Sequence, residues 1–525
     1  MTRRTRLWAA GAVAAAVTLA GAGVGVASAA AEPPPLAFTR AAPEVIADRY
    51  VWEGQAYIYL DLGIHVIAGK HPFEIRATRA SYAKPIKARQ YVVKNGKRTA
   101  VNLPIGMVLG WNGLKDFTTV SIRNSTGTEV ASYSTDFCPN SWNSARTRRD
   151  APAQNPYPRG CAGGNPFHLG AVWGIQAGWN AEVNANPQTQ ILDLPDGQYQ
   201  ATVALNPRYR AQFKIPEQNA TQTVGLTVRT ADDGGVVGAG LTKARLEAAR
   251  AGANTAPRAV AAAHAEHAGQ GDPATQIAAY QPGFRPPAKA PKAVPLSRVA
   301  KGPRPDLRSL PAWGISLAQE EGRWNVNFGA TVWNAGTSPL LVDGFRRTGS
   351  ELMDAYQYFF DTKGKEVASV KAGTMEWDAR DGHRHWHFTD FAQYNLLSAD
   401  KQLAVRSGKE AFCLANTDAV DYTIPGAKWR PDNTDLSSSC GQNTAVAVRE
   451  VLDVGSGDTY TQARPGQSFD VTDLPNGSYW IEVKANPVGT LTELSTKNNS
   501  AFREIRLGGT AEARTLEIPT VYGLD

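Results

Sequence analysis

The chain has 525 residues, of which 42% are hydrophobic and 20% are charged, and its formal net charge is +7. This length exceeds what one hydrophobic core supports, so the composition excludes a single-core protein and predicts two or more domains. The charge is modest for the length, and basic residues are not interleaved with aromatic ones, which argues against a nucleic-acid-binding protein.

Residues 1–29 have the pattern of a secretory signal peptide. A basic start leads into a run rich in Ala, Gly and Val that ends at Ala27-Ser28-Ala29, which is typical of a cleavage site. Arg6 occupies a position where a twin-arginine signal has an apolar residue, so the sequence favours the Sec route. The alternative is an uncleaved membrane anchor, but the run is only weakly apolar. We therefore expect a secreted, extracellular protein.

Two regions, residues 32–230 and 303–525, carry the same motifs in the same order. Leu194-Pro-Asp-Gly-Gln-Tyr199 matches Leu474-Pro-Asn-Gly-Ser-Tyr479. The other matched pairs are Gln90-Tyr91 with Gln357-Tyr358, Asp116-Phe117 with Asp390-Phe391, Phe137-Cys138 with Phe412-Cys413, Cys161 with Cys440, and Asn206-Pro207 with Asn486-Pro487. Chance similarity does not keep such an order, so the sequence predicts an internal duplication.

Both regions are predicted to be β-structure. Runs such as Trp324–Trp333 alternate between apolar and polar residues, and they are bounded by turn residues. Asp196-Gly197 and Asn476-Gly477 are hairpin signals. We expect an all-β protein with two β-sandwich domains of related fold. Residues 231–302 are rich in Ala, Pro and Gly and poor in aromatics, which predicts a flexible linker between the domains.

The chain has four cysteines, Cys138, Cys161, Cys413 and Cys440. Export permits disulfides, and metal ligation is the alternative. None of the four stands at the CxxC spacing of a metal site, so disulfides are favoured. Because the cysteines occupy matched positions in the two regions, we expect one disulfide in each, Cys138–Cys161 and Cys413–Cys440.

Three of the eight histidines fall within Asp381-Gly-His-Arg-His-Trp-His387. In a strand, the period of two places His383, His385 and His387 on one face. Imidazoles suit a late first-row metal such as copper(II) or zinc, and three of them leave an open coordination position. One ion holds all three only if the strand twists or bulges, because a straight strand separates the outer pair by about 13 Å. A solvated edge strand with exposed His side chains is the alternative.

The first region serves as a control for this interpretation. The positions that align with the three histidines are Leu109, Trp111 and Gly113. The first region therefore has the shared motifs but none of the three histidines, which indicates a specialised site in the second region.

The motifs that follow the histidines resemble those of the lysyl oxidase family. The family has three alternating His followed by an acidic residue and Phe, here Asp390-Phe391. It continues with a Lys a few residues before Phe-Cys-Leu, here Gly408-Lys409-Glu-Ala-Phe-Cys413-Leu414. It then has Asp-Thr-Tyr ahead of an Asp-Ile-Thr-Asp-like strand, here Asp458-Thr459-Tyr460 and Asp470-Val-Thr-Asp473. The resemblance covers residues 303–507. Animal members are richer in Cys, and they place a Trp-His-x-Cys segment before the first copper ligand, so the chain looks like a bacterial form.

The resemblance implies a copper(II) site at His383, His385 and His387. It also implies a lysine tyrosylquinone cofactor formed from Lys409 and Tyr460. The implied reaction is oxidative deamination of a primary amine, either peptidyl lysine or a small amine, by O₂. The products are an aldehyde, H₂O₂ and ammonia.

Several residues have two interpretations. Asp458 is a candidate general base, and it is equally a turn residue. Asp390 is expected to orient a copper-ligating His. Outside the family pattern, Lys409 would be a solvated charge and Tyr460 a packing residue.

Other classes of protein are also open. A non-catalytic copper- or zinc-binding protein at the cell surface would need the histidines but neither Lys409 nor Tyr460. A cupin-type dioxygenase is disfavoured, because no Glu follows the His motif at the required distance. A structural cell-wall or adhesion protein built from two sandwiches is a third class, and such a role, as a substrate-binding or docking module, is expected for the first region alone.

Overall fold

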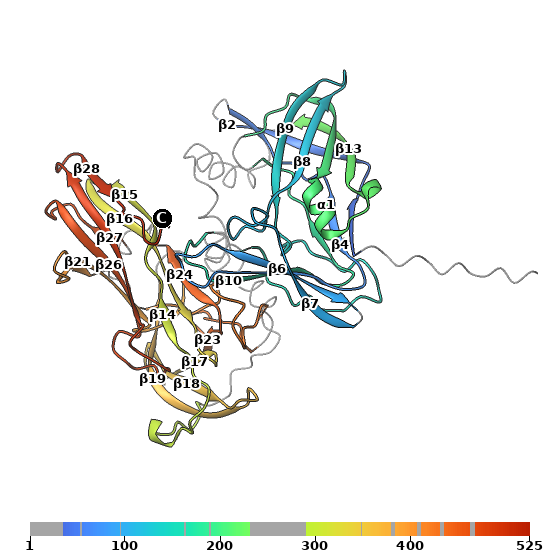
Figure 1. Cartoon of the computed structure of the whole chain (residues 1–525). Helices are drawn as coiled ribbons and strands as arrows, with labels where there is room; N and C mark the ends of the chain where they lie inside the picture. Colours follow the sequence, from blue (N-terminus) through green and yellow to red (C-terminus); the bar gives the residue numbers. More distant parts are fainter. Residues whose placement is uncertain are drawn as a thin grey trace, which may run out of the picture. The chain divides into compact units, whose positions relative to one another are not determined.

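The computed structural model describes residues 35–52, 55–94, 96–161, 164–187, 191–231, 290–347, 349–379, 384–406, 411–430, 435–461 and 468–524. The predicted signal peptide and most of the predicted linker lie outside these residues. Strands make up 50% and helices 3% of the chain, which confirms the predicted all-β class. Figure 1 colours the strands along the sequence, from blue near the N-terminus to red near the C-terminus. None of the helices in the described part of the chain has the length and apolar character to span a bilayer.

The described residues of the first half form three sheets. The first sheet has the order β1 (Leu36–Arg40), β4 (Ile64–Ala68), β11 (Asn180–Glu182). The second has the order β10 (Gly170–Ile175), β5 (Phe73–Thr78), β6 (Lys87–Lys94), β7 (Lys97–Asn102). The third has the order β3 (Gln55–Ile58), β2 (Glu44–Trp52), β13 (Thr221–Thr230), β12 (Gly197–Leu205), β8 (Leu114–Asn124), β9 (Glu129–Phe137). A short helix, α1 (Pro207–Phe213), follows β12.

Three sheets are also present in the part of the second half that the structure covers. In the first, β16 (Arg323–Asn334) pairs with β14 (Leu307–Ser309), β15 (Trp313–Glu320), β24 (Gly457–Thr461) and β25 (Phe469–Asp470). The second has the order β20 (His385–Phe388), β19 (Glu366–Asp378), β18 (Leu352–Phe360), β17 (Leu340–Arg346), β23 (Ala447–Leu452). The third has the order β22 (Leu403–Arg406), β21 (Ala392–Ser398), β26 (Gly477–Ala485), β27 (Ser500–Gly509), β28 (Arg514–Glu517).

The sheets of the two halves follow the same strand order. The run β13-β12-β8-β9 corresponds to β27-β26-β21-β22, and β10-β5-β6-β7 corresponds to β23-β17-β18-β19. Likewise β1-β4-β11 corresponds to β14-β16-β24. Among the described residues, the halves differ at their sheet edges. β2 pairs with β13 in the first half, whereas β28 pairs with β27 and β15 pairs with β16 in the second. The sheet that ends at β7 in the first half continues past β19 in the second half, where β20 is added at its edge.

Local contacts repeat together with the strand order. The hydroxyl of Tyr199 donates a hydrogen bond to the carbonyl of Pro195 at 2.8 Å, and the hydroxyl of Tyr479 donates to Pro475 at the same distance. The two predicted disulfides, Cys138–Cys161 and Cys413–Cys440, are both present. Each half therefore repeats the same tyrosine contact and the same disulfide.

Each half has its own hydrophobic core, and the two halves also share buried contacts. Alternating strand residues fill the cores, with Trp173 and Phe117 in the first half and Trp386 and Phe388 in the second. A further buried cluster joins Phe167 of the first half to residues of the second half. Its other buried members are Leu310, Trp313, Trp333 and Val420.

The repeated tyrosine contact predicts matched effects on stability. We expect Tyr199→Phe and Tyr479→Phe each to lower the free energy of unfolding by about 1 kcal/mol, because a proline carbonyl loses its donor. Urea denaturation followed by Trp fluorescence measures the change. Tyr522→Phe, at a side chain that is 62% exposed, is the control. Unchanged denaturation midpoints in both Tyr199→Phe and Tyr479→Phe would contradict the prediction.

Candidate active site

The histidine-rich segment forms the edge strand β20. His385 lies opposite Asp378, and His387 lies opposite Glu376, in the antiparallel register with β19. The period of two places both imidazoles on one face, while Trp386 and Phe388 point into the core with 0% exposure. The His385 and His387 ring centroids are 4.7 Å apart. Two imidazoles are thus held side by side on a strand that has no counterpart in the described first half.

A buried carboxylate accompanies His387, which is only 1% exposed. The Nδ1 atom of His387 lies 3.4 Å from Oδ2 of Asp378. A carboxylate in this position orients an imidazole and raises its basicity, as is common beside metal ligands. The sequence predicts an orienting role for Asp390, which follows β20 with a left-handed φ of 59°, and for this residue the role stays a prediction. Asp378 was missed, although its position in the strand before the histidines was a possible signal.

Two of the sequence-predicted site residues, His383 and Lys409, lie outside the described residues. Within the residues that the structure covers, no group of three or more His, Cys, Asp or Glu side chains is arranged to hold a metal ion. His385 and His387, with Asp378 beside them, nevertheless supply imidazole nitrogens of the kind that copper(II) and zinc prefer. The described part of the predicted ligand set therefore fits such a metal.

The other predicted site residues lie on β24. Asp458 pairs with Val332 and Tyr460 with Ala330 of β16, and the two side chains share one face of β24 because they are two residues apart. Asp458 is 2% exposed. The Tyr460 hydroxyl donates a hydrogen bond to the Cys413 carbonyl at 2.8 Å. This contact brings the phenol to a segment that begins four positions after Lys409.

Burial and neighbouring acids govern the protons in this region. Burial raises the pKa of Tyr460 well above its usual value, and Asp458 and Glu450 raise it further. Burial also raises the pKa of Glu450 well above its usual value, with a smaller contribution from Asp458. Glu450, on β23, is 0% exposed, and its Oε2 accepts a hydrogen bond from the Leu414 amide at 3.0 Å. Burial and the proximity of other acids both disfavour negative charge, so protonated forms are favoured in this cluster.

The Cys413–Cys440 disulfide links β20 to β24. The backbone carbonyl of Cys440 accepts a hydrogen bond from Trp386 of β20 at 3.0 Å. Phe412, next to Cys413, exchanges two backbone hydrogen bonds with the last residue of β20, at 2.8 and 3.0 Å. The Phe412 ring also packs edge-on against Tyr460, with centroids 4.9 Å apart. Phe412, Cys413 and Cys440, here called the disulfide segment, therefore contact both β20 with its imidazoles and β24 with Tyr460.

A buried turn leads from β23 into β24. Asp453, at its start, is 1% exposed, and its Oδ1 accepts a hydrogen bond from the Val454 amide at 2.7 Å. Its backbone carbonyl accepts a second bond from Ser456 at 3.1 Å. Burial raises the pKa of Asp453 to about 7. The turn thus contains a carboxyl group that binds its proton more tightly in the folded protein than in the unfolded chain.

This shift predicts a pH dependence of stability. The unfolded carboxyl has a pKa of about 3.8. The folded state therefore binds more protons between that pH and about 7, and the free energy of unfolding falls as the pH rises through this range, by up to about 4 kcal/mol. In Asp453→Asn this fall should be largely absent in urea denaturation between pH 4 and 7. Asp473→Asn, at a side chain that is 88% exposed, is the control. An equally steep fall in Asp453→Asn would contradict the prediction.

Known proteins resemble the part of the chain that carries these groups. The family described as lysyl oxidase matches residues 355–515. The protein-lysine 6-oxidase of Sus scrofa is 33% identical over 135 residues, which are 25% of this chain and 48% of that protein. The protein-lysine 6-oxidase of Bos taurus is 33% identical over 135 residues, 25% of this chain and 28% of that protein. Lysyl oxidase homolog 2 of Gallus gallus is 24% identical over 194 residues, 37% of this chain and 21% of that protein.

The chain spans less than half the length of these curated relatives. The family match begins within β18 and ends within β28, so it includes β20, the Cys413–Cys440 disulfide and β24. Residues 355–515 thus contain a lysyl oxidase family domain that is distantly related to protein-lysine 6-oxidases.

Proposed function

We propose that this protein is a secreted, copper-dependent amine oxidase that converts a primary amine, peptidyl lysine or a small amine, to an aldehyde. The overall reaction is RCH₂NH₂ + O₂ + H₂O → RCHO + NH₃ + H₂O₂. The proposal is carried by one observation. Within a lysyl oxidase family domain, the partly buried Tyr460 is bonded to the same disulfide segment that holds the imidazole strand β20.

His383, His385 and His387 would hold the copper ion. The close approach of the His385 and His387 rings, and the Asp378 carboxylate beside His387, support this assignment. When present, copper(II) and a lysine tyrosylquinone made from Lys409 and Tyr460 would supply the redox chemistry that amino-acid side chains lack.

Asp458 is proposed as the general base. A carboxylate oxygen of Asp458 would accept the proton from the α-carbon of the amine, because this residue shares the face of β24 with Tyr460. Asp458 raises the pKa of both Tyr460 and Glu450, which places its charge close to both groups. Glu450 would hold a proton in the same region.

Aromatic side chains surround this end of the site. Phe412 is 0% exposed and Tyr394 is 2% exposed, and their rings contact each other with centroids 5.7 Å apart. Such a wall limits the access of water to Tyr460 and strengthens the electrostatic interactions beside it.

The two halves are proposed to be duplicated domains, residues 32–230 and 303–525, joined by the linker 231–302. The shared strand order and the matched Tyr199 and Tyr479 contacts support this organisation. Only the second domain would be catalytic. The strand that corresponds to β24 in the first half is β11, and its sequence is Asn180-Ala-Glu182, with no tyrosine. A signal peptide at residues 1–29 and two disulfides are consistent with secretion.

The proposed cofactor gives the first functional prediction. Protein secreted into copper-supplemented medium should show a quinone absorption band and a positive quinone stain. Lys409→Ala and Tyr460→Phe should lose both signals and keep bound copper, because neither residue is a proposed ligand. Lys497→Ala and Tyr522→Phe, both at exposed positions, are the matched controls and should keep the quinone. Copper without a quinone in the unmutated protein would identify a non-catalytic metal-binding protein instead.

The second prediction compares the two disulfides. Replacing either pair by Ala should lower the free energy of unfolding by about 3.5 kcal/mol, because the loops of 23 and 27 residues are similar. Only the loss of Cys413–Cys440 should also reduce the quinone yield, on the order of tenfold, because that pair connects β20 to Tyr460. Thermal unfolding and quinone absorbance, measured side by side, test the difference. Equal quinone yields in the two variants would contradict the proposed role of this disulfide.

A further inference from the structure

A segment of the first half, residues 164–170, is buried against the second half. Phe167 and His168 are 0% exposed. The Leu169 amide donates a hydrogen bond to the Val420 carbonyl at 2.8 Å, and the Gly170 carbonyl accepts one from the Tyr422 amide at 2.9 Å. The segment therefore joins the second half through its backbone as well as through its side chains.

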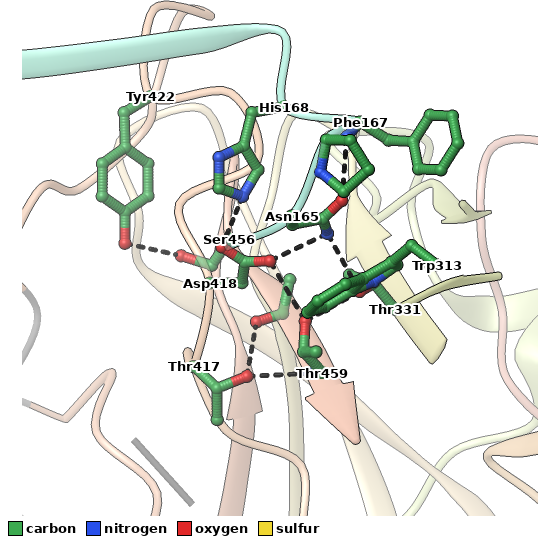
Figure 2. Close-up of polar contacts among 12 residues, drawn as sticks. Asn165, Phe167, His168, Trp313, Thr331, Thr417, Asp418, Tyr422, Ser456 and Thr459 are labelled. Atoms are coloured by element: carbon green, nitrogen blue, oxygen red, sulfur yellow. Dashed lines mark hydrogen bonds and ion pairs between the residues drawn. The ribbon is translucent and has the colours of Figure 1, made fainter. Parts of the chain in front are cut away.

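At the centre of this contact, two side chains of the first half bind one carboxylate of the second. The His168 Nε2 atom lies 2.5 Å from Oδ1 of Asp418. The Asn165 side-chain amide donates to Oδ2 of Asp418 at 2.9 Å. Figure 2 shows His168 and Asn165 approaching Asp418 from one side and Thr459 from the other. All four residues are buried.

The Asp418 carboxylate is stabilised in its charged form. Burial acts to raise its pKa, but interactions with His168, Asn165 and Thr459 outweigh burial, and the pKa is lowered. A buried charge depends on its partners, because removing one of them leaves an uncompensated group in a medium of low dielectric constant. The position of Asp418 therefore depends on the first half.

Asp418 is bonded directly to β24. The Thr459 hydroxyl donates to Oδ2 of Asp418 at 3.2 Å. The backbone of Asp418 and the backbone of Gly457 exchange two hydrogen bonds, at 2.7 and 3.0 Å. Thr459 lies between Asp458 and Tyr460, so its side chain occupies the opposite face of the strand. The same five-residue strand thus carries the proposed catalytic groups on one face and the Asp418 contacts on the other.

We propose that His168 of the first half is a positioning residue that acts through Asp418 to fix β24, and thereby Tyr460, in the catalytic half. The inference rests on the proposed function and extends it, because it makes the first half part of the active-site scaffold. Trp111, which aligns with His385 of the second half, packs edge-on against His168 with ring centroids 6.0 Å apart. In the first half, the residue that aligns with the proposed copper ligand His385 is therefore a tryptophan that packs against His168.

The approach of the two halves at this point also depends on a glycine. A Cβ atom at Gly170 would lie 2.1 Å from Oδ1 of Asp421 and 2.5 Å from the Thr423 hydroxyl. Gly170→Ala therefore forces a shift at this contact between the halves, beginning with the Asp421 and Thr423 side chains, while it removes none of the hydrogen-bonding groups around Asp418. At Gly110, also in the first half, an added Cβ would meet nothing within 4 Å. Gly110→Ala is the matched control.

The experiment uses the full-length secreted chain with five sequences: unmutated, His168→Ala, His168→Gln, Gly170→Ala and Gly110→Ala. Hydrogen exchange followed by mass spectrometry, on copper-free protein, measures the protection of β24 relative to β26 and β27. The rate of quinone formation after copper addition is the second measurement. Intact-mass analysis of both disulfides and thermal unfolding identify any variant that fails to fold.

We expect His168→Ala and Gly170→Ala to exchange β24 amides on the order of tenfold faster while β26 and β27 keep their protection. Quinone formation should slow on the order of 100-fold in both variants, because small misplacement of reacting groups has effects of this size. His168→Gln keeps a hydrogen-bond donor near the position of Nε2. It should therefore keep most of the β24 amide protection and most of the rate of quinone formation. Gly110→Ala should match the unmutated protein.

Unchanged exchange of β24 in both His168→Ala and Gly170→Ala would overturn the inference, whatever the quinone signal. Faster exchange with an unchanged rate of quinone formation would also overturn it, since the contact would then stabilise without positioning. If the unmutated protein forms no quinone, the proposed function fails. The exchange of β24 then decides by itself whether His168 fixes this strand.

Discussion

The structure of the site depends on β24, a short strand that is buried on both faces. Buried polar groups must find partners, because each unsatisfied group costs about 1–3 kcal/mol and an unpaired charge costs more. β16 satisfies the backbone on one edge of β24, and the chain at Asp418 satisfies part of the other. The side chains face the disulfide segment on one side and the His168–Asp418 contact on the other. Three separate parts of the chain therefore converge on five residues.

The duplicated strand order explains how such a site can be added to a sandwich. Both halves use the same order of central strands and the same tyrosine contact, at Tyr199 and Tyr479. The second half departs from this plan at a sheet edge, where unpaired backbone groups accept another strand with little change to the core. β20 occupies that edge, with Trp386 and Phe388 anchoring it in the core and the imidazoles on its other face. The added strand places two imidazoles at the sheet edge without altering the framework.

The sequence could predict the parts of this arrangement that depend on local patterns. Alternating histidines predict a strand with His385 and His387 on one face, and matched cysteines predict both disulfides, because these features need only the strand period or the duplication. The Glu450 carboxylate could not be found in this way, because pairing with the distant strand β17 brings it to the site. Asp378 lies only seven positions before its partner His385, so the local pattern could have indicated it. His168 is isolated in the sequence, and its partner Asp418 is 250 positions away. Only the folded contact between the halves relates them.

The pKa values of the acidic groups shift in opposite directions on the two faces of β24, because the groups have different partners. On one face, His168 offsets the desolvation of Asp418, so that carboxyl stays charged and serves as a fixed anchor. On the other face, burial and neighbouring acids raise the pKa values of Tyr460 and Glu450, so these groups retain protons. A fixed charge suits a structural contact, whereas a group that retains its proton suits a site of proton transfer. A single strand therefore separates a hydrogen-bonded scaffold from a proton-holding site, and the first half provides the His168 and Asn165 contacts that hold the Asp418 carboxylate in place.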